Sequence, residues 1–267
     1  MAGPGFFPAT EPARFRVLGR VGIGPDPVGV RGVKPRALLV VLLLRAGRRV
    51  SLDAIQEALW DGEPPRSAVA NIRTHASALR TALCAGAASG AASRAGALAG
   101  GDGGYTLHAE PGDCDHLRFL ESSAAGRAAL LAGDAARATR LLGPALGLWD
   151  GDRAAVGVPR LGPLAGALDH LDEERMRAVE DLAEAHLWVG EPRAALRDLT
   201  GLLASAPLRS RSWALRMRAH HRIGELGGVS ESYRAACAVF RDELGIAPGG
   251  ELRSLYAELT GALPRSA

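Results

Sequence analysis

The chain has 267 residues, 47% of them apolar and only 4% aromatic, and its formal net charge is +3. This length predicts about two domains, whose cores rest mainly on Leu, Val and Ala. The three cysteines, Cys84, Cys114 and Cys237, are far apart and odd in number, and none belongs to a CxxC or a Cys/His cluster. The pattern therefore indicates neither a disulfide framework nor a metal site.

Targeting and membrane signals are weak. Residues 1–13 lack the apolar stretch of a secretory signal and are interpreted as a loose leader. The most apolar run, ALLVVLLL at 37–44, is far shorter than the roughly 20 residues that cross a bilayer. It is expected to be a fully buried helix, and the protein is expected to be cytoplasmic, with no membrane partner.

Charge is unevenly distributed along the chain. Residues 1–110 contain 13 Arg and Lys and 8 Asp and Glu, whereas residues 111–267 contain 19 Arg and Lys and 21 Asp and Glu. A basic N-terminal part on a mildly acidic remainder is typical of nucleic-acid contact by the first part. The sequence has no phosphate-binding glycine loop, no HExxH and no GxSxG, so we predict no enzyme activity and no cofactor.

Residues 14–110 are predicted to form a winged helix, in which the third helix enters the major groove and a hairpin wing follows. The first expected elements are a strand pair from 15–24 and 28–33 and a helix over 34–47 that is closed by Gly47. A brief strand at 48–51 and a helix over 52–60, with Ser51 as its N-cap, come next. A loop at 61–66 then leads to a helix over 67–83, a flexible Gly/Ala-rich insert at 84–101 and a strand at 105–110.

The third helix, SAVANIRTHASALRTAL at 67–83, has its large apolar side chains at steps of three and four residues. They are Val69, Ile72, Leu79 and Leu83, with Ala76 filling the gap. This spacing predicts a helix that buries one stripe.

The opposite face of that helix holds short side chains, with arginines at one border and a histidine toward the other. Such a face lets a helix approach base edges closely, while long cations reach phosphates or guanines. A solvated face without a partner is the alternative. The candidate DNA-binding residues are Arg66, Asn71, Arg73, Thr74, His75, Ser77, Arg80 and Thr81.

Residues 111–264 are predicted to be a helical domain. A helical hairpin is expected over 116–149, turned at Gly133–Asp134, and residues 150–172 are broken by Gly and Pro and receive no assignment. Further helices are expected at about 173–189, 194–205, 208–223, 229–243 and 251–262.

Two turns of this part repeat. AHLWVGE at 185–191 and AHHRIGE at 219–225 lie 34 residues apart, with Ala, His and Gly in register. That period is typical of tetratricopeptide helix pairs. The predicted fold class is therefore mainly α: an N-terminal winged helix-turn-helix with small sheets and a wing, followed by an all-α tetratricopeptide-like domain.

Motifs along residues 14–262 resemble the Streptomyces antibiotic regulatory protein family. The Lys-led Leu-rich helix, VSLDAIQEALW, the Pro-Pro loop, SALRTAL and GGYTLHAE resemble its winged helix. GDCDHLRFLESSAAGRAALLAGD and, most specifically, ELGIAPGGELRSLY resemble the start and end of its bacterial transcriptional activator domain.

The resemblance implies a transcriptional activator of a biosynthetic gene cluster, often one for a secondary metabolite such as an antibiotic. Its partners would be double-stranded DNA, bound at promoter direct repeats as a homodimer, and RNA polymerase holoenzyme. The loop between the second and third helices would touch the polymerase, through Asp61, Glu63, Pro64 and Pro65. The wing departs from many relatives, which carry an Arg just before Gly-Tyr. Here the stretch ALAGGDGGY contains Asp102, and no Arg lies between Arg94 and Gly104–Tyr105.

A tetratricopeptide-type adaptor with a degenerate winged helix is the alternative function. In that case Trp149, Trp188 and Trp213 would line a groove for a protein partner, although packing between helices is the favoured interpretation of these side chains. The pair His220–His221 is likewise interpreted as packing or surface rather than as a site.

Overall fold

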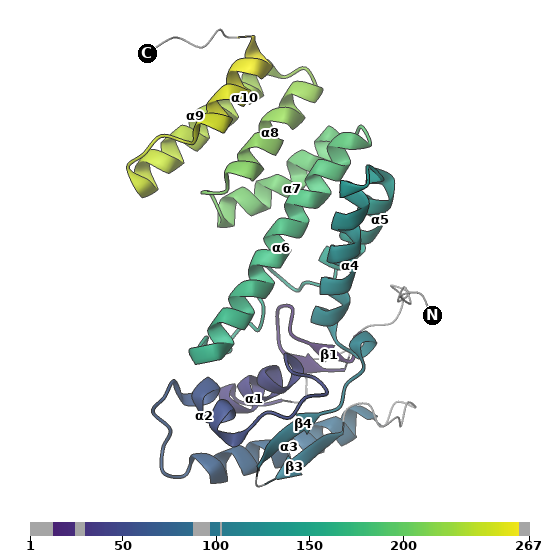
Figure 1. Cartoon of the computed structure of the whole chain (residues 1–267), viewed down its shortest axis with the longest axis vertical. Helices are drawn as coiled ribbons and strands as arrows, with labels where there is room; N and C mark the ends of the chain where they lie inside the picture. The colour runs from purple at the N-terminus through teal and green to yellow at the C-terminus, as the bar shows by residue number, and fades with distance from the viewer. Residues whose placement is uncertain (1–12, 25–29, 88–96, 102, 262–267) are drawn as a thin grey trace. The chain divides into compact units, whose positions relative to one another are not determined.

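The computed structural model describes residues 13–24, 30–87, 97–101 and 103–261. Helices dominate this part of the chain, and two small antiparallel sheets lie near its N-terminus (Figure 1). The chain divides into two compact units. Unit 1 is Met1–Glu121 with Gly147–Glu174, and unit 2 is Ser122–Leu146 with Arg175–Ala267.

Three helices form the centre of unit 1. They are α1 (Val33–Leu43), α2 (Leu52–Trp60) and α3 (Ala68–Ala87), and α1 packs against both of the others. Residues 37–43 of α1 are all buried, which confirms the prediction of an interior helix. The helix ends at Leu43 and not at the predicted Gly47, whose N–H donates to the Leu107 carbonyl of the wing at 2.9 Å. The Oγ of Ser51 accepts a hydrogen bond from the Ala54 N–H at 3.2 Å, so the predicted N-cap of α2 is also confirmed.

The first sheet pairs β1 (Phe15–Arg16) with β2 (Gly22–Ile23). We expected residues 15–24 to pair with 28–33, and for the residues that the structure describes this is wrong. The hairpin closes within 15–24, and residues 30–32 form no strand. Residues 25–29 lie outside the described part. The turn of this hairpin has a partner far along the chain instead. The N–H groups of Asp150 and Val156 donate to the carbonyls of Leu18 and Gly19 at 2.9 and 2.8 Å.

The wing is the second sheet, formed by β3 (Leu98–Gly101) and β4 (Gly104–Leu107). Val50 adds a short third edge, since its N–H and C=O exchange hydrogen bonds of 2.8 and 2.9 Å with Tyr105. The flexible insert expected at 84–101 is wrong at both ends, because α3 continues to Ala87 and β3 begins at Leu98. Residues 88–96 lie outside the description.

The remaining elements are helical. They are the 3-10 turn η1 (Pro111–Asp113) and the helices α4 (Asp115–Leu131), α5 (Ala135–Leu146), α6 (Gly162–Trp188), α7 (Pro192–Ser205), α8 (Ser210–Arg222), α9 (Leu226–Leu244) and α10 (Gly250–Thr260). The predicted turn between α4 and α5 is confirmed, with Gly133 at φ 82° and Asp134 Oδ1 accepting the Arg137 N–H at 2.9 Å. Helix α6 begins well before the expected residue 173.

The two similar turns have the same geometry. Gly190 and Gly224 adopt φ of 82° and 81°, a left-handed conformation that favours glycine. Just before each of them, Ala185 and Ala219 are fully buried. In each turn the Glu N–H donates to the His carbonyl five residues earlier, Glu191 to His186 at 2.8 Å and Glu225 to His220 at 2.9 Å. The tetratricopeptide-like repeat is therefore confirmed.

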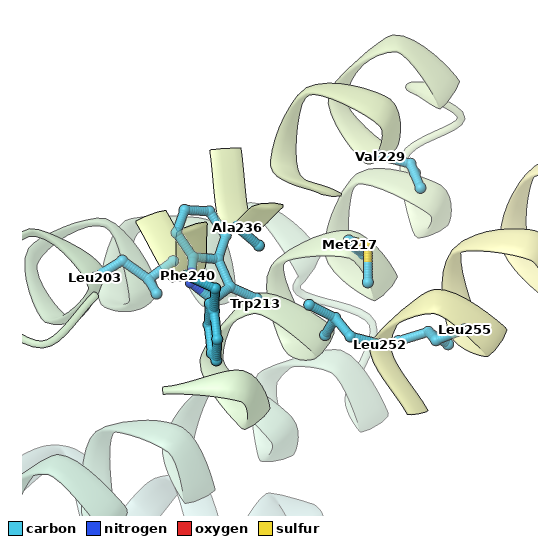
Figure 2. Packing of buried hydrophobic residues seen from close by; sticks show 8 residues of the cluster. All are labelled: Leu203, Trp213, Met217, Val229, Ala236, Phe240, Leu252 and Leu255. Carbon is cyan, nitrogen blue, oxygen red and sulfur yellow. The ribbon is translucent and has the colours of Figure 1, made fainter. Parts of the chain in front are cut away.

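A hydrophobic cluster joins the last helices of unit 2 (Figure 2). It contains Leu203, Trp213, Met217, Val229, Ala236, Phe240, Leu252 and Leu255. Trp213 is buried and its indole N–H donates to the Pro207 carbonyl at 2.8 Å, so core packing is confirmed for this residue. Trp149 is half-buried, with its ring 5.3 Å from that of Phe119 in an edge-to-face arrangement. For Trp188 the core interpretation is wrong, because 53% of it is exposed.

The predicted fold class is confirmed: a winged helix with two small sheets precedes paired helices. None of the helices within the described ranges is long and apolar enough to span a bilayer.

Candidate nucleic-acid interface

Helix α3 buries the stripe that its sequence predicts. Ile72, Ala76, Leu79 and Leu83 are 0 to 4% exposed, whereas Val69 is only half-buried. Ala68, one residue earlier, is buried in its place at the start of the helix. The stripe fixes which side of α3 is turned away from the core.

The outward side of α3 is exposed and carries short polar groups. Thr74, Ser77 and Thr81 are exposed. The hydroxyls of Thr74 and Thr81 donate to the carbonyls of Ala70 and Ser77 at 3.1 and 3.3 Å. Their protons are thereby occupied, while each hydroxyl oxygen keeps lone pairs that can accept a hydrogen bond. Such acceptors match the amino groups of cytosine and adenine in a major groove.

Asn71 lies at the beginning of this face, and its amide nitrogen donates to the Ser67 Oγ at 3.3 Å. It is half-buried, whereas Arg66 and Arg73 are exposed beside it. The amide at the start of α3 is thus accompanied by two long cations, Arg66 just before the helix and Arg73 within it.

Arg80, the second arginine of α3 after Arg73, contacts the wing through its guanidinium. Its Nε donates to the Leu98 carbonyl at 3.1 Å and its Nη2 to the Gly100 carbonyl at 3.0 Å. The guanidinium also lies 5.6 Å from the centre of the buried Tyr105 ring. Arg80 therefore positions the wing against α3, and its contact with DNA stays a prediction.

His75 borders the face on its other side and is half-buried. Burial lowers the pKa of His75, and the positive charge of Lys34 lowers it further. Lys34 is held nearby, because its ammonium donates to the Leu59 carbonyl and lies 5.0 Å from the centre of the Trp60 ring. Both effects favour the neutral imidazole, which offers a hydrogen bond rather than a charge.

The loop between α2 and α3 is exposed along residues 61–66. Its start is fixed, because the Glu63 N–H donates to the Trp60 carbonyl at 3.1 Å and Asp61 adopts φ 53°. The Asp61 carboxylate accepts the N–H of Gly162, the first residue of α6, at 3.2 Å. Sequence reasoning missed this link between distant residues. Asp61 is thus anchored, while Glu63, Pro64 and Pro65 remain on the surface.

One cation at the wing was missed by sequence reasoning. Arg49 is exposed and precedes Val50, whose pairing with Tyr105 places it at the hairpin. Its guanidinium lies directly over Gly103, so that a Cβ added there would be 3.2 Å from Cζ and overlap Nη2. Arg94 and Asp102, the charged residues of the wing sequence, lie outside the described residues.

Unit 2 contains a groove of about 810 Å³. Its floor carries the buried carboxylates Glu180 and Asp181, which pair with Arg209 at 2.8 Å and with Arg211 at 2.7 Å. Burial opposes the charge of Arg211, yet hydrogen bonds to its carboxylate partners raise the pKa of the guanidinium overall. The exposed Trp188 ring lines the groove.

Comparisons with known proteins agree with this arrangement. The family described as the bacterial transcriptional activator domain matches residues 114–260. The chain is 35% identical to the transcriptional regulator RedD of Streptomyces coelicolor, over 98% of this chain and 74% of RedD. It is also 35% identical to the regulatory protein AfsR of Streptomyces griseus, but spans only 25% of that protein.

A solved structure, Mycobacterium tuberculosis EmbR in complex with a low-affinity phosphopeptide, aligns with a TM-score of 0.82 and 29% identity. The alignment covers 96% of this chain and 66% of that chain. A winged helix joined to paired helices, in a chain with these relatives, defines a transcriptional regulator. The chain belongs to the Streptomyces antibiotic regulatory protein family and carries its bacterial transcriptional activator domain.

Proposed function

We propose that the chain binds promoter DNA through α3 and activates transcription of a biosynthetic gene cluster, in keeping with the antibiotic regulators it resembles. The observation that carries the proposal is the outward face of α3, where exposed hydroxyls stand beside Arg66 and Arg73. Base-edge contacts from the short side chains would supply specificity, and phosphate contacts from the arginines would supply affinity.

Recruitment of RNA polymerase holoenzyme is the second part of the proposal. The α2–α3 loop presents Glu63, Pro64 and Pro65 on the surface next to the DNA-binding helix. Its anchoring through Asp61 and Gly162 keeps this surface in one shape, which lowers the entropy lost on binding.

We further propose that two copies bind side by side on direct repeats. A single α3 offers few cations, so one copy alone is expected to bind weakly and with a shallow dependence on salt. Repeats spaced by about one helical turn, or whole multiples of it, would place both copies on one face of the duplex.

Footprinting of promoters around the protein's own gene, with and without RNA polymerase, tests the proposal. We expect a protected pair of repeats whose occupancy rises when polymerase is present. Asn71→Ala and Arg73→Ala should abolish protection, while Arg140→Ala, on the exposed surface of unit 2, should leave it unchanged. Unchanged protection by the α3 variants would remove α3 from the interface.

An adaptor function for unit 2 is favoured by one observation, the exposed Trp188 ring in the groove. Exposed tryptophans in concave surfaces are common anchors for protein partners. If this groove binds a partner, Trp188→Ala should lower activation of a reporter gene while DNA binding and the melting temperature stay unchanged. Equal activation by the variant and the parent would argue against a partner at this groove.

A further inference from the structure

The wing has no cation of its own in its described residues. Residues 97–101 and 103–107 contain neither Arg nor Lys. A wing that lies along a duplex faces phosphates, and neutral backbone groups alone contribute little to affinity there. Positive charge beside these described residues has to come from a neighbouring segment.

Arg49 supplies that charge from the segment between α1 and α2. The hydrogen bonds between Val50 and Tyr105, at 2.8 and 2.9 Å, make this segment an additional edge of the wing sheet. Arg49 is exposed, and its guanidinium lies over Gly103 at the end of the hairpin.

A side chain is excluded by different neighbouring atoms at the different glycines of the hairpin. Gly100 and Gly104 have φ of 116° and 130°, and a Cβ on either would overlap backbone oxygen atoms. At Gly103 the neighbouring atoms are of a different kind. The three atoms nearest to a Cβ at this position all belong to the Arg49 guanidinium. Gly103 therefore leaves space for that group.

The end of the wing is also tied to the DNA-binding helix. Arg80, at the border of the outward face of α3, donates to the carbonyls of Leu98 and Gly100. Gly100 in turn pairs with Tyr105, the residue that bonds to Val50. Strand β3 lies alongside α3 in Figure 1, and β4 packs against α1. The hairpin that carries the Arg49 guanidinium at its end is thus attached to the border of the outward face of α3.

We propose that Arg49 is the DNA-contacting cation of the wing, and that Gly103 is small so that the guanidinium can rest at the hairpin tip. The inference rests on the proposed DNA binding. Its ligand is the anionic surface of the duplex next to the wing, either a phosphate or a narrow minor groove, both of which attract arginine.

The test uses the full chain and a promoter fragment, with affinity measured by fluorescence anisotropy at several salt concentrations. Arg49→Ala should weaken binding roughly three- to tenfold and lower the slope of log affinity against log salt by about one. Arg48→Ala is the matched control, because it removes the same charge one residue away and should have a much smaller effect. Arg49→Lys should retain binding at a phosphate and lose it in a minor groove.

Gly103→Ala tests whether DNA binding depends on the position of the Arg49 guanidinium at the hairpin tip. It preserves every charge and displaces the guanidinium, so it should weaken binding in the parent and have no further effect in Arg49→Ala. Thermal melting of each variant should match the parent. Three outcomes would overturn this inference and leave the proposed function standing. They are equal affinities of Arg49→Ala and the parent, equal losses of affinity in Arg48→Ala and Arg49→Ala, and additive losses when Gly103→Ala is combined with Arg49→Ala. Absence of duplex binding by the parent would overturn the proposed function, and this inference with it.

Discussion

At the scale of single residues, one buried carboxylate organises the start of the described chain. Asp115 is 2% exposed and accepts the N–H groups of Val17 and Leu18 at 2.9 Å and that of His116 at 2.7 Å. Each of these donors would lack a partner without the carboxylate, and an unpaired buried N–H is costly. Asp115 therefore contributes to stability rather than to binding.

Replacing Asp115 should destabilise unit 1, and the loss should depend on how many acceptor oxygens the new side chain keeps. Asp115→Ala leaves three buried N–H groups unpaired and should lower the free energy of unfolding by about 3 kcal/mol or more. Asp115→Asn keeps one acceptor oxygen and should cost less. Urea unfolding measures both, with the exposed Asp152→Ala as control. Parent-like stability of Asp115→Ala would contradict the assigned role.

His75 should make stability depend on pH. Its pKa in the folded state lies below the usual 6.5, because burial and Lys34 disfavour the charged form. The unfolded chain therefore binds more protons as the pH falls below 6.5, so stability is full above this pH and decreases below it. The difference in melting temperature between the parent and His75→Gln, followed from pH 7.5 down to pH 5, isolates this contribution. A difference that does not vary with pH would show that His75 is not responsible.

At the scale of elements, the DNA-binding surface depends on how the wing is attached to α3. Two hydrogen bonds from Arg80 and the ring of Tyr105 provide that attachment. The hairpin is short, since β3 and β4 have four residues each, and a two-stranded hairpin alone is marginally stable in water. Its order is therefore conferred by its neighbours.

Arg80→Met should loosen the wing without unfolding the helices. The methionine keeps apolar contact with the Tyr105 ring but loses both donors. We expect hydrogen exchange at β3 and β4 to become faster, while exchange in α1 stays unchanged. Arg73→Met, on the exposed side of the same helix, is the control and should leave exchange in the wing as in the parent. Equal exchange in both variants would mean that Arg80 does not hold the wing.

At the scale of the whole molecule, unit 1 is assembled from segments far apart in the sequence. The domain limits predicted from sequence, 14–110 and 111–264, stay a prediction, but unit 1 also includes Gly147–Glu174. Within it, Ala155 N–H donates to the Val17 carbonyl at 2.7 Å, and Asp61 accepts the Gly162 N–H. The winged helix is thus completed by residues that follow α5.

A fragment ending at residue 110 should therefore be poorly stable. It lacks Asp115 and the segment that pairs with Leu18 and Gly19, so buried backbone groups of residues 17–19, just after β1, would be left unpaired. We expect its melting temperature to fall well below that of unit 1 in the full chain, with broad amide signals in NMR spectra. A cooperative fragment with parent-like melting would show that 14–110 is self-sufficient.

By itself, the sequence determined the local features: the buried run of α1, the Ser51 cap, the stripe of α3 and the repeated turns at Gly190 and Gly224. These follow from periodicity, capping and backbone freedom, which act between residues a few positions apart. The tertiary structure alone decided that Arg80 holds the wing, that Arg49 lies over Gly103 and that Asp61 meets Gly162. Contacts between distant segments depend on how the whole core packs, and no local pattern of side chains encodes them.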